Sequence, residues 1–409
     1  MTAGLTPTAF AEALRQRLAL ERWPLPPTAL PADAALVGGA IRDAALGRLD
    51  ERPDLDLVVP ADAVSLAQSL ARREGGSCVV LDAERDIARL VLGGWTIDLA
   101  RREGPDLTRD LLRRDYTVNA LALPLAPGHT VVDPTGGLKH LEQRQLVAIS
   151  EANLLDDPLR LLRGVRLAAE LEFTLTADSL RWIQHHGPAL ANVAGERVLA
   201  ELEKLALAPA GQRGLGLALE FQLLAPWGAT PATGLEEALL SPNSGEARGM
   251  DPQELAAALP VARLAWLLDG KAIAQLKGSR RLQQRCSGLR HWWHLLAGLS
   301  LEALPEPERL ALHEQLGADL PAWLLGRPVA EAREALKRWR DPADPLFHPH
   351  APVDGRLLQQ ALGLKPGPGL GRLLLHLKRE QAFRRLPRTD AAAALACARD
   401  WLAAEPPAP

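Results

Sequence analysis

Residues 36–59, LVGGAIRDAALGRLDERPDLDLVV, place two apolar runs on either side of a diglycine and a helix-like segment. Residues 35–37 are apolar and stop at Gly38-Gly39, and residues 40–46 then have helical character. Leu55–Val59 alternates before it becomes wholly apolar, which is typical of a strand entering a core. The stretch therefore predicts a strand, a tight turn, a helix and a second strand.

Two aspartates begin the second of these strands. Successive strand side chains alternate between faces, so Asp54 and Asp56 project from the same side, separated by the apolar Leu55. Two carboxylates so placed repel each other unless a cation lies between them, and hard oxygen ligands suit Mg²⁺. The alternative is an exposed strand with ordinary solvated aspartates, because a D-x-D pattern alone is short.

The diglycine upstream makes the D-x-D pattern a more specific indication of a phosphate-binding site. Glycines let a backbone approach a phosphate closely, and the N-terminus of the following helix offers free N–H groups. Arg42 lies one turn into that helix, where its guanidinium can reach a phosphate oxygen. The alternative interpretation is a plain tight turn that binds no ligand.

The rest of the chain divides into a mixed part and a helical part. Further strands are expected at residues 77–81, 87–92 and 95–100, with a helix at 63–74. From Asp156 onward the apolar period is 3.6, and prolines gather at the joints. We predict an α+β fold with a head at 1–150, a helical neck at 151–215, and a helical body and tail at 216–409.

Composition indicates a folded protein of two or three domains. The chain has 409 residues, 47% of them hydrophobic and 24% charged. No apolar run is long enough for a bilayer, and the N-terminus has no signal-peptide pattern. Three widely spaced cysteines fit a reducing compartment. We therefore expect a cytoplasmic protein without a membrane partner.

Two basic stretches suggest a phosphate-bearing partner despite the net charge of −3. Residues 271–294 contain six lysines and arginines and no acidic residue, and residues 356–388 contain eight with Glu380 alone opposing them. The alternative is a solvated helix face. Trp292 and Trp293 could stack on RNA, but adjacent tryptophans on a helix more often serve the core.

The residues 37–59 and four later blocks resemble the signature of class II tRNA nucleotidyltransferases and bacterial poly(A) polymerases. The later blocks occur in the family's order. They are RRDYTVNAL at 113–121, DPTGG at 133–137, DDPLRLLRGVR at 156–166 and ERVLAEL at 196–202. Tyr116 replaces the commoner Phe, and Asp156 replaces the usual Glu. The resemblance is strong over residues 34–205 and implies a polymerase-β-like palm.

The resemblance also implies roles for particular residues. It places Mg²⁺ at Asp54 and Asp56, with Asp98 as a candidate third catalytic carboxylate whose alternative is a salt bridge to Arg101 or Arg102. Asp110 is a weaker candidate for the third carboxylate. The nucleotide-binding residues that the resemblance implies are Gly38, Gly39, Arg42, Asp43, Arg114, Asp115, Asn119, Asp157, Arg160, Arg163 and Arg166.

Four of these residues form the expected base-reading face. Asp157, Arg160, Arg163 and Arg166 are spaced by three, so a helix places them on one side. A carboxylate accepts from the exocyclic amine that cytosine and adenine share, while a guanidinium donates to ring acceptors. Base choice could thus come from protein side chains without a template. Surface ion pairing is the alternative for Arg163 and Arg166.

The function implied is addition of nucleotides from CTP or ATP to the 3′ end of tRNA. The resemblance implies that members that build the complete CCA end carry a longer segment where this chain runs from residues 101–107 almost directly into residues 108–111. We therefore predict a CC-adding enzyme, with a separate A-adding enzyme acting afterwards. The alternatives are an A-adding or full CCA-adding enzyme, a poly(A) polymerase, and a tRNA-binding protein with an inactive palm.

Overall fold

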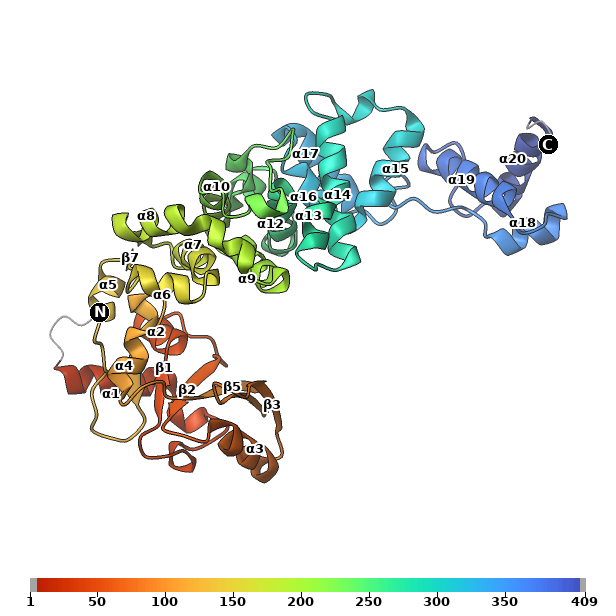
Figure 1. Cartoon of the computed structure of the whole chain (residues 1–409). Helices are drawn as coiled ribbons and strands as arrows, with labels where there is room; N and C mark the ends of the chain where they lie inside the picture. Colours follow the sequence, from red (N-terminus) through yellow and green to blue (C-terminus); the bar gives the residue numbers. More distant parts are fainter. Residues whose placement is uncertain (1–5, 405–409) are drawn as a thin grey trace. The chain divides into compact units, whose positions relative to one another are not determined.

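The computed structural model describes residues 6–404 and falls into two compact units (Figure 1). The first unit ends at Val193 and also takes Phe221–Leu223. The second unit takes Ala194–Glu220 and the chain from Leu224 onward. Within residues 6–404, none of the helices has the length and apolar character needed to traverse a bilayer.

The first unit mixes strands and helices, as the sequence predicted. Its strands are β1 (Ala35–Val37), β2 (Leu55–Val59), β3 (Ser77–Asp82), β4 (Ile87–Leu92), β5 (Trp95–Arg101), β6 (Ala122–Pro124), β7 (Gln145–Leu146) and β8 (Thr174–Leu175). Its helices are α1 (Pro7–Leu18), α2 (Gly39–Leu46), α3 (Ala63–Glu74), α4 (Leu107–Leu112), α5 (Gly137–Glu142), α6 (Glu151–Asp156), α7 (Leu159–Leu171) and α8 (Ala177–His186).

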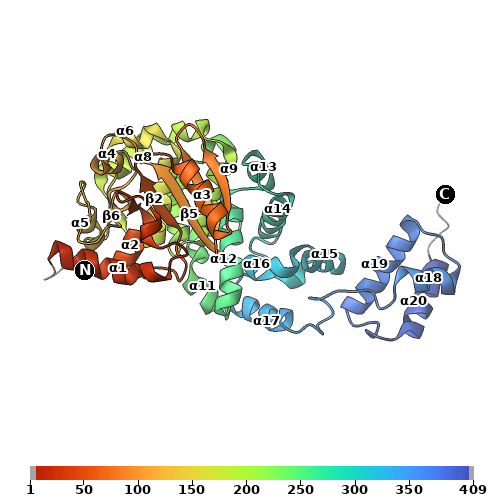
Figure 2. The same cartoon turned by 90° about the horizontal axis from the view of Figure 1, so that it is seen from below.

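Six of the strands form one sheet in the order β3-β4-β5-β2-β1-β6. The β2 and β5 pair is parallel, and the other neighbours are antiparallel. Helix α3 packs against β3, β4 and β5 (Figure 2). The strands alternate, because Ala88, Leu90 and Leu99 are buried while Arg89 and Asp98 point to the opposite face. One face of the sheet is therefore core. On the other face, Val37 and Val58 pack against Leu111, and the polar side chains Arg89, Asp98 and Asp56 leave part of the face open.

The second unit is helical in its described residues. Its helices are α9 (Gly195–Leu207), α10 (Gly211–Glu220), α11 (Pro242–Ala247), α12 (Pro252–Leu267), α13 (Gly270–Gln275), α14 (Arg280–Leu295), α15 (Glu306–Leu316), α16 (Leu320–Leu324), α17 (Val329–Trp339), α18 (Gly355–Leu362), α19 (Pro368–Ala382) and α20 (Ala391–Ala404). The α+β head and helical remainder are thus confirmed. The boundaries at residues 150 and 215 stay a prediction, and α6 and α7 belong to the first compact unit.

Both tryptophans of α14 serve the core. Trp292 and Trp293 are buried, and their indole nitrogens donate to Gln315 Oε1 at 2.8 Å and to the Trp323 carbonyl at 3.0 Å. These contacts satisfy the one donor that each indole carries. The core interpretation of the tryptophan pair is therefore confirmed.

Burial of His313 makes the second unit sensitive to acid. His313 lies in α15 against Phe347 with only 3% of its surface exposed. Burial, assisted by the nearby Arg338, lowers its pKa to about 3. The unfolded chain binds this proton near pH 6.5, so the unfolded state gains protons first as the pH falls.

We predict that the free energy of unfolding of the second unit falls by about 2 kcal/mol between pH 7 and pH 5 through this group. Urea unfolding followed by tryptophan fluorescence measures it. The His313→Leu variant should lack this component of the pH dependence. Equal pH slopes for the wild type and the variant would contradict the assignment.

Candidate active site

Three carboxylates gather on the open face of the sheet. The parallel register of β2 and β5 places Asp56 directly beside Asp98, and Asp54 precedes Asp56 by two residues on the same face. Asp54 is exposed and Asp56 is half-buried. Burial raises the pKa of Asp56, and the charges of Asp98 and Asp54 raise it further, against the opposing effect of Arg114 and Arg163. Burial is thus the main cause of the raised pKa of Asp56, and the two neighbouring carboxylates add to it.

Asp98 is held by an arginine that the sequence analysis did not select. The antiparallel register of β4 and β5 puts Arg89 opposite Asp98, and the Arg89 Nε and Nη2 atoms each donate to a different Asp98 oxygen at 2.8 Å. The alternative expected from the sequence, a salt bridge from Asp98 to Arg101 or Arg102, was therefore wrong. Arg101 lies three residues further along β5, so its side chain points to the other face of the sheet.

The glycine turn and the RRDYT segment meet at the carboxylates. Gly38 has φ 74° and ψ −136°, which strongly favours glycine. A Cβ atom at Gly38 would lie 3.3 Å from an Asp56 carboxylate oxygen and 3.5 Å from Arg114 Nη1. Three sequence motifs that are far apart in the chain are therefore neighbours at this point.

Arg42 is engaged inside the protein. Its guanidinium donates to both oxygens of Asp43, at 2.8 and 2.9 Å, and to Asn119 Oδ1 at 2.8 Å. Only 6% of Arg42 is exposed. The structure thus shows Arg42, Asp43 and Asn119 as one hydrogen-bonded group behind the glycine turn.

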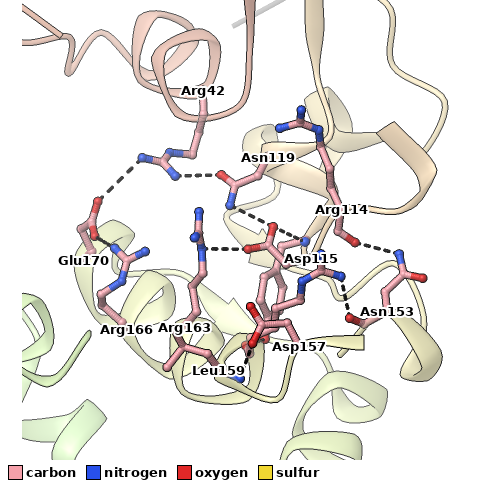
Figure 3. A network of polar contacts seen from close by, with 12 residues as sticks. Arg42, Arg114, Asp115, Asn119, Asn153, Asp157, Leu159, Arg163, Arg166 and Glu170 are labelled. Carbon is pink, nitrogen blue, oxygen red and sulfur yellow. Dashed lines mark hydrogen bonds and ion pairs between the residues drawn. The ribbon is translucent and has the colours of Figure 1, made fainter. Parts of the chain in front are cut away.

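Two arginines of α7, the expected base-reading helix, form ion pairs within the first unit (Figure 3). Arg163 Nε lies 2.8 Å from Asp115, and Arg166 pairs with Glu170, which also lies 3.7 Å from Arg42. Burial alone would raise the pKa of Asp115, but Arg163 and the hydrogen bonds of Asp115 hold that pKa below its ordinary value. Asp115 is therefore an ionised anchor for α7.

A cavity of about 470 Å³ lies within the first unit, beside the start of α7. Asp157 and Arg160 line it together with Arg114. Asp157 follows α6 in extended backbone and precedes Pro158, so the expectation that it lies on one helix with Arg160, Arg163 and Arg166 was wrong. Its remaining lining residues are Val58, Arg85, Ile87, Ala100, Arg101, Glu103, Asp110, Arg113 and Asp156. The cavity therefore joins the start of α7 to the open face of the sheet.

The sequence analysis missed Asn153, which positions Arg160. Asn153 donates to the carbonyls of Leu112 and Arg114, at 2.8 and 2.7 Å, and its own carbonyl accepts from Arg160 Nη1 at 2.6 Å. Arg160 Nη1 also donates to the Arg113 carbonyl at 3.0 Å. The guanidinium is thus fixed by main-chain oxygens, which leave no side-chain pattern in a sequence.

Tyr116 joins the RRDYT segment to α7. It is fully buried, and its hydroxyl donates to the Arg160 carbonyl at 3.0 Å. Gly164, one turn further, leaves room for the ring, because a Cβ there would lie 1.8 Å from the Tyr116 hydroxyl oxygen. The Tyr at the place of the commoner Phe therefore has a specific partner.

The short connection between β5 and α4 is anchored at several points. The Arg102 amide donates to the Val59 carbonyl at 2.8 Å, and the Glu103 amide donates to Asp110 Oδ1 at 3.0 Å. Glu103 pairs with Arg113, and Asp106 caps α4. Asp110 also accepts from Arg114 at 3.1 Å, so its role here is to position neighbours.

Several arginines of the two basic stretches form ion pairs or hydrogen bonds within the second unit. Arg285 pairs with Asp319, and Arg290 Nη1 donates to three main-chain carbonyls. Arg385 pairs with Glu306 and Glu380. The exposed side chains left in residues 271–294 include Lys271, Lys277, Arg280 and Arg281. The phosphate-binding surface we predict is therefore smaller than the sequence count suggests.

The carboxylates fit a divalent cation that shares its ligands with a substrate. Within residues 6–404, no group of three or more His, Cys, Asp or Glu side chains forms a ready cage for a metal ion. Asp54 and Asp56 nevertheless offer hard oxygen donors on one face of β2, with the Asp98 carboxylate beside Asp56. Mg²⁺ bound by two carboxylates completes its shell with water and phosphate oxygens.

Carboxylates on a mixed sheet, a glycine turn behind them and a cavity lined by cations define a nucleotidyltransferase of the polymerase-β-like type. The Poly A polymerase head domain matches residues 34–147. A second model, described as "Probable RNA and SrmB- binding site of polymerase A", matches residues 172–227.

The similar proteins extend this match over the whole chain. The chain is 34% identical to the CC-adding tRNA nucleotidyltransferase of Synechocystis over 91% of its own length and 94% of that protein. It is 42% identical to the A-adding tRNA nucleotidyltransferase of Deinococcus radiodurans over 47% of its length. The Bacillus stearothermophilus CCA-adding enzyme in complex with CTP shares the fold, with a TM-score of 0.67 and 22% identity over 98% of both chains. The chain belongs to the tRNA nucleotidyltransferase and poly(A) polymerase family.

We predict that Gly164→Ala lowers the free energy of unfolding by about 1–3 kcal/mol, because α7 must move away from the Tyr116 ring to accommodate the methyl group. Chemical denaturation measures the change. Gly371→Ala is the matched control, since Gly371 also lies in a helix and a Cβ there meets no atom within 4 Å. Equal stability of the two variants would contradict the contact.

Proposed function

We propose that this protein adds the two cytidines of the CCA end to tRNA, using CTP and no nucleic-acid template, and then stops. The observation that carries the CC specificity is the anchored five-residue connection, residues 102–106, between β5 and α4. A pocket that must accept bases of two sizes needs a mobile element, and so short a connection with fixed ends supplies little movement.

The similar proteins support the same choice. Relatives named as CC-adding enzymes match nearly the whole chain, including one from Thermus thermophilus at 34% identity over 93% of that protein. The A-adding relative matches about half of it. The intact carboxylates argue against a purely tRNA-binding role.

In the reaction we propose, the 3′ hydroxyl of the tRNA attacks the α-phosphate of CTP in line, and pyrophosphate leaves. Asp54 and Asp56 would hold Mg²⁺, and the bound ion would supply neutralisation of the negative charge that develops on the phosphate oxygens. Asp98 is the third carboxylate of this centre. Gly38, Gly39 and Arg114 lie close enough to Asp56 to receive the triphosphate beside it.

Base selection in this proposal belongs to Asp157 and Arg160 at the cavity wall. The Asp157 carboxylate accepts from the cytosine amine, and the Arg160 guanidinium, held by two main-chain carbonyls, donates to ring acceptors. Uracil has an oxygen where cytosine has the amine, so it would oppose the carboxylate. Arg163 and Arg166 keep this helix in place through their own ion pairs.

Transfer RNA is the macromolecular partner, and we place its backbone against exposed cations of the second unit such as Lys277, Arg280 and Arg281. We assign the reaction to the cytoplasm, which the three free cysteines support. A separate A-adding enzyme would complete the CCA end.

The proposal is tested with tRNA lacking the CCA end and tRNA ending in CC, each supplied with labelled CTP or ATP. We expect two cytidines on the first substrate and A addition to the second at least about a hundredfold slower than C addition. Denaturing gels resolve each added nucleotide. Efficient A addition to the CC-ended tRNA would refute the CC-only specificity, and no addition at all would refute the enzyme assignment.

Loss of one metal ligand should separate catalysis from binding. We predict that Asp56→Asn lowers the rate of C addition by about a thousandfold or more, because the charge that holds the cation is removed. Its tRNA affinity should stay within about twofold, since phosphate contacts elsewhere supply binding. Asp33→Asn, an exposed aspartate of the same unit, is the control. Substantial C addition by Asp56→Asn would remove Asp56 from the metal site.

A further inference from the structure

Arg89 forms an ion pair with Asp98, one of the three carboxylates of the cluster formed by Asp54, Asp56 and Asp98. Its strand β4 lies next to β5, which lies next to β2, so Arg89, Asp98 and Asp56 stand side by side across three strands. Neighbouring strands are about 4.8 Å apart. Arg89 is therefore within two strand spacings of the proposed metal ligands and interacts electrostatically with Asp54 and Asp56 as well.

The pair engages both carboxylate oxygens of Asp98 with one cation. Two Arg89 nitrogens contact the two Asp98 oxygens in a bidentate arrangement, which is the strongest geometry for this pair. A divalent ion at Asp98 would need at least one of these oxygens. Arg89 and a metal ion at Asp98 are thus competitors for the same atoms.

The surroundings allow Arg89 to leave. The Arg89 side chain is 45% exposed and the Asp98 side chain is 25% exposed, so the pair lies at the surface of the open face. A bidentate pair is stronger than an ordinary surface ion pair, but at this exposure water can hydrate both partners when they separate. Arg89 can therefore be exchanged for a divalent cation, whose higher charge attracts the carboxylate more strongly.

We propose that Arg89 is an exchangeable counter-ion that occupies Asp98 in the free protein and so restricts the resting site to one divalent ion, at Asp54 and Asp56. This inference rests on the proposed metal site. Arg89 acts through Asp98 and is a positioning residue. It keeps the third carboxylate neutralised until a further cation, brought with the substrates, takes its place.

The test is a Mn²⁺ titration of the full-length protein without nucleotide or tRNA, with free Mn²⁺ counted by electron paramagnetic resonance. The wild type should bind one Mn²⁺ ion. Arg89→Gln should bind a second ion, or bind the first about tenfold more tightly, because one positive charge is removed close to the site. Arg89→Lys should behave as the wild type, since it keeps the charge.

The double variant Arg89→Gln/Asp98→Asn should lose the gain, which shows that it depends on the freed carboxylate. Arg340→Gln is the matched control, because Arg340 makes a comparable bidentate pair with Glu254 in the other unit. Mn²⁺ binding by Arg89→Gln that equals the wild type would overturn the counter-ion role.

The two proposals fail in distinguishable ways. Mn²⁺ binding that is unchanged in Asp56→Asn would remove the metal site and this inference with it. A wild type that adds no cytidine to tRNA would refute the proposed function while leaving the Mn²⁺ titration of the Arg89 variants as an independent result.

Discussion

Electrostatic repulsion among Asp54, Asp56 and Asp98 is the constraint around which the first unit is arranged. Strand register fixes their separation, so the repulsion cannot be relieved by moving one side chain far away. At about 4 Å, two like charges repel by about 1 kcal/mol in water and by about 4 kcal/mol near a protein surface. Arg89, Arg114 and Arg163 oppose this field, while burial, more than the neighbouring carboxylates, keeps the pKa of Asp56 raised. A divalent cation would offset both the burial and the repulsion by stabilising the ionised carboxylates.

Segment 113–119 connects the carboxylates to α7, the helix to which we assign base selection. Consecutive side chains of this segment extend to different elements: Arg114 lies beside Gly38, Asp115 holds Arg163, and the Tyr116 hydroxyl holds the main chain of α7. Because Asp115 and Tyr116 are buried, these contacts are shielded from water and define one geometry. The chemical step and the base contact are thus built on one short piece of backbone.

Local patterns in the sequence predicted the elements well, and long-range partners poorly. Alternation located β2, β4 and β5, and the diglycine located the turn before α2. The partner of Asp98 depends on which residue of β4 lies opposite, and the register of a hairpin changes with one residue in its turn. A neighbouring arginine in the sequence was therefore a poor guide, and Arg89 was missed.

Hydrogen bonds from side chains to the main chain could not be predicted from the sequence for a related reason. Asn153 and Arg160 act on carbonyl oxygens, which every residue carries, so no residue type marks their partners. The phosphate-binding surface predicted from the basic stretches was too large, because a charge count does not distinguish a solvated arginine from one that is already bound. Arg290, for example, donates to main-chain carbonyls of its own unit. The short connection at 102–106 could be counted in the sequence, but its anchoring by Val59 and Asp110 could not.

Anchoring of that connection favours the smaller base on physical grounds. A rigid wall rejects a purine from a pocket shaped for a pyrimidine, because the excess atoms of the larger base must displace packed groups. The reverse selection is harder, since a pocket shaped for adenine admits cytosine and loses only a modest part of the binding free energy. A pocket with Asp157 and Arg160 on one wall and a fixed Glu103–Arg113 pair at its edge therefore needs no moving part to prefer cytosine. An enzyme that also accepts adenine would have to loosen the same contacts, and with them the fixed Arg160 guanidinium that distinguishes cytosine from uracil.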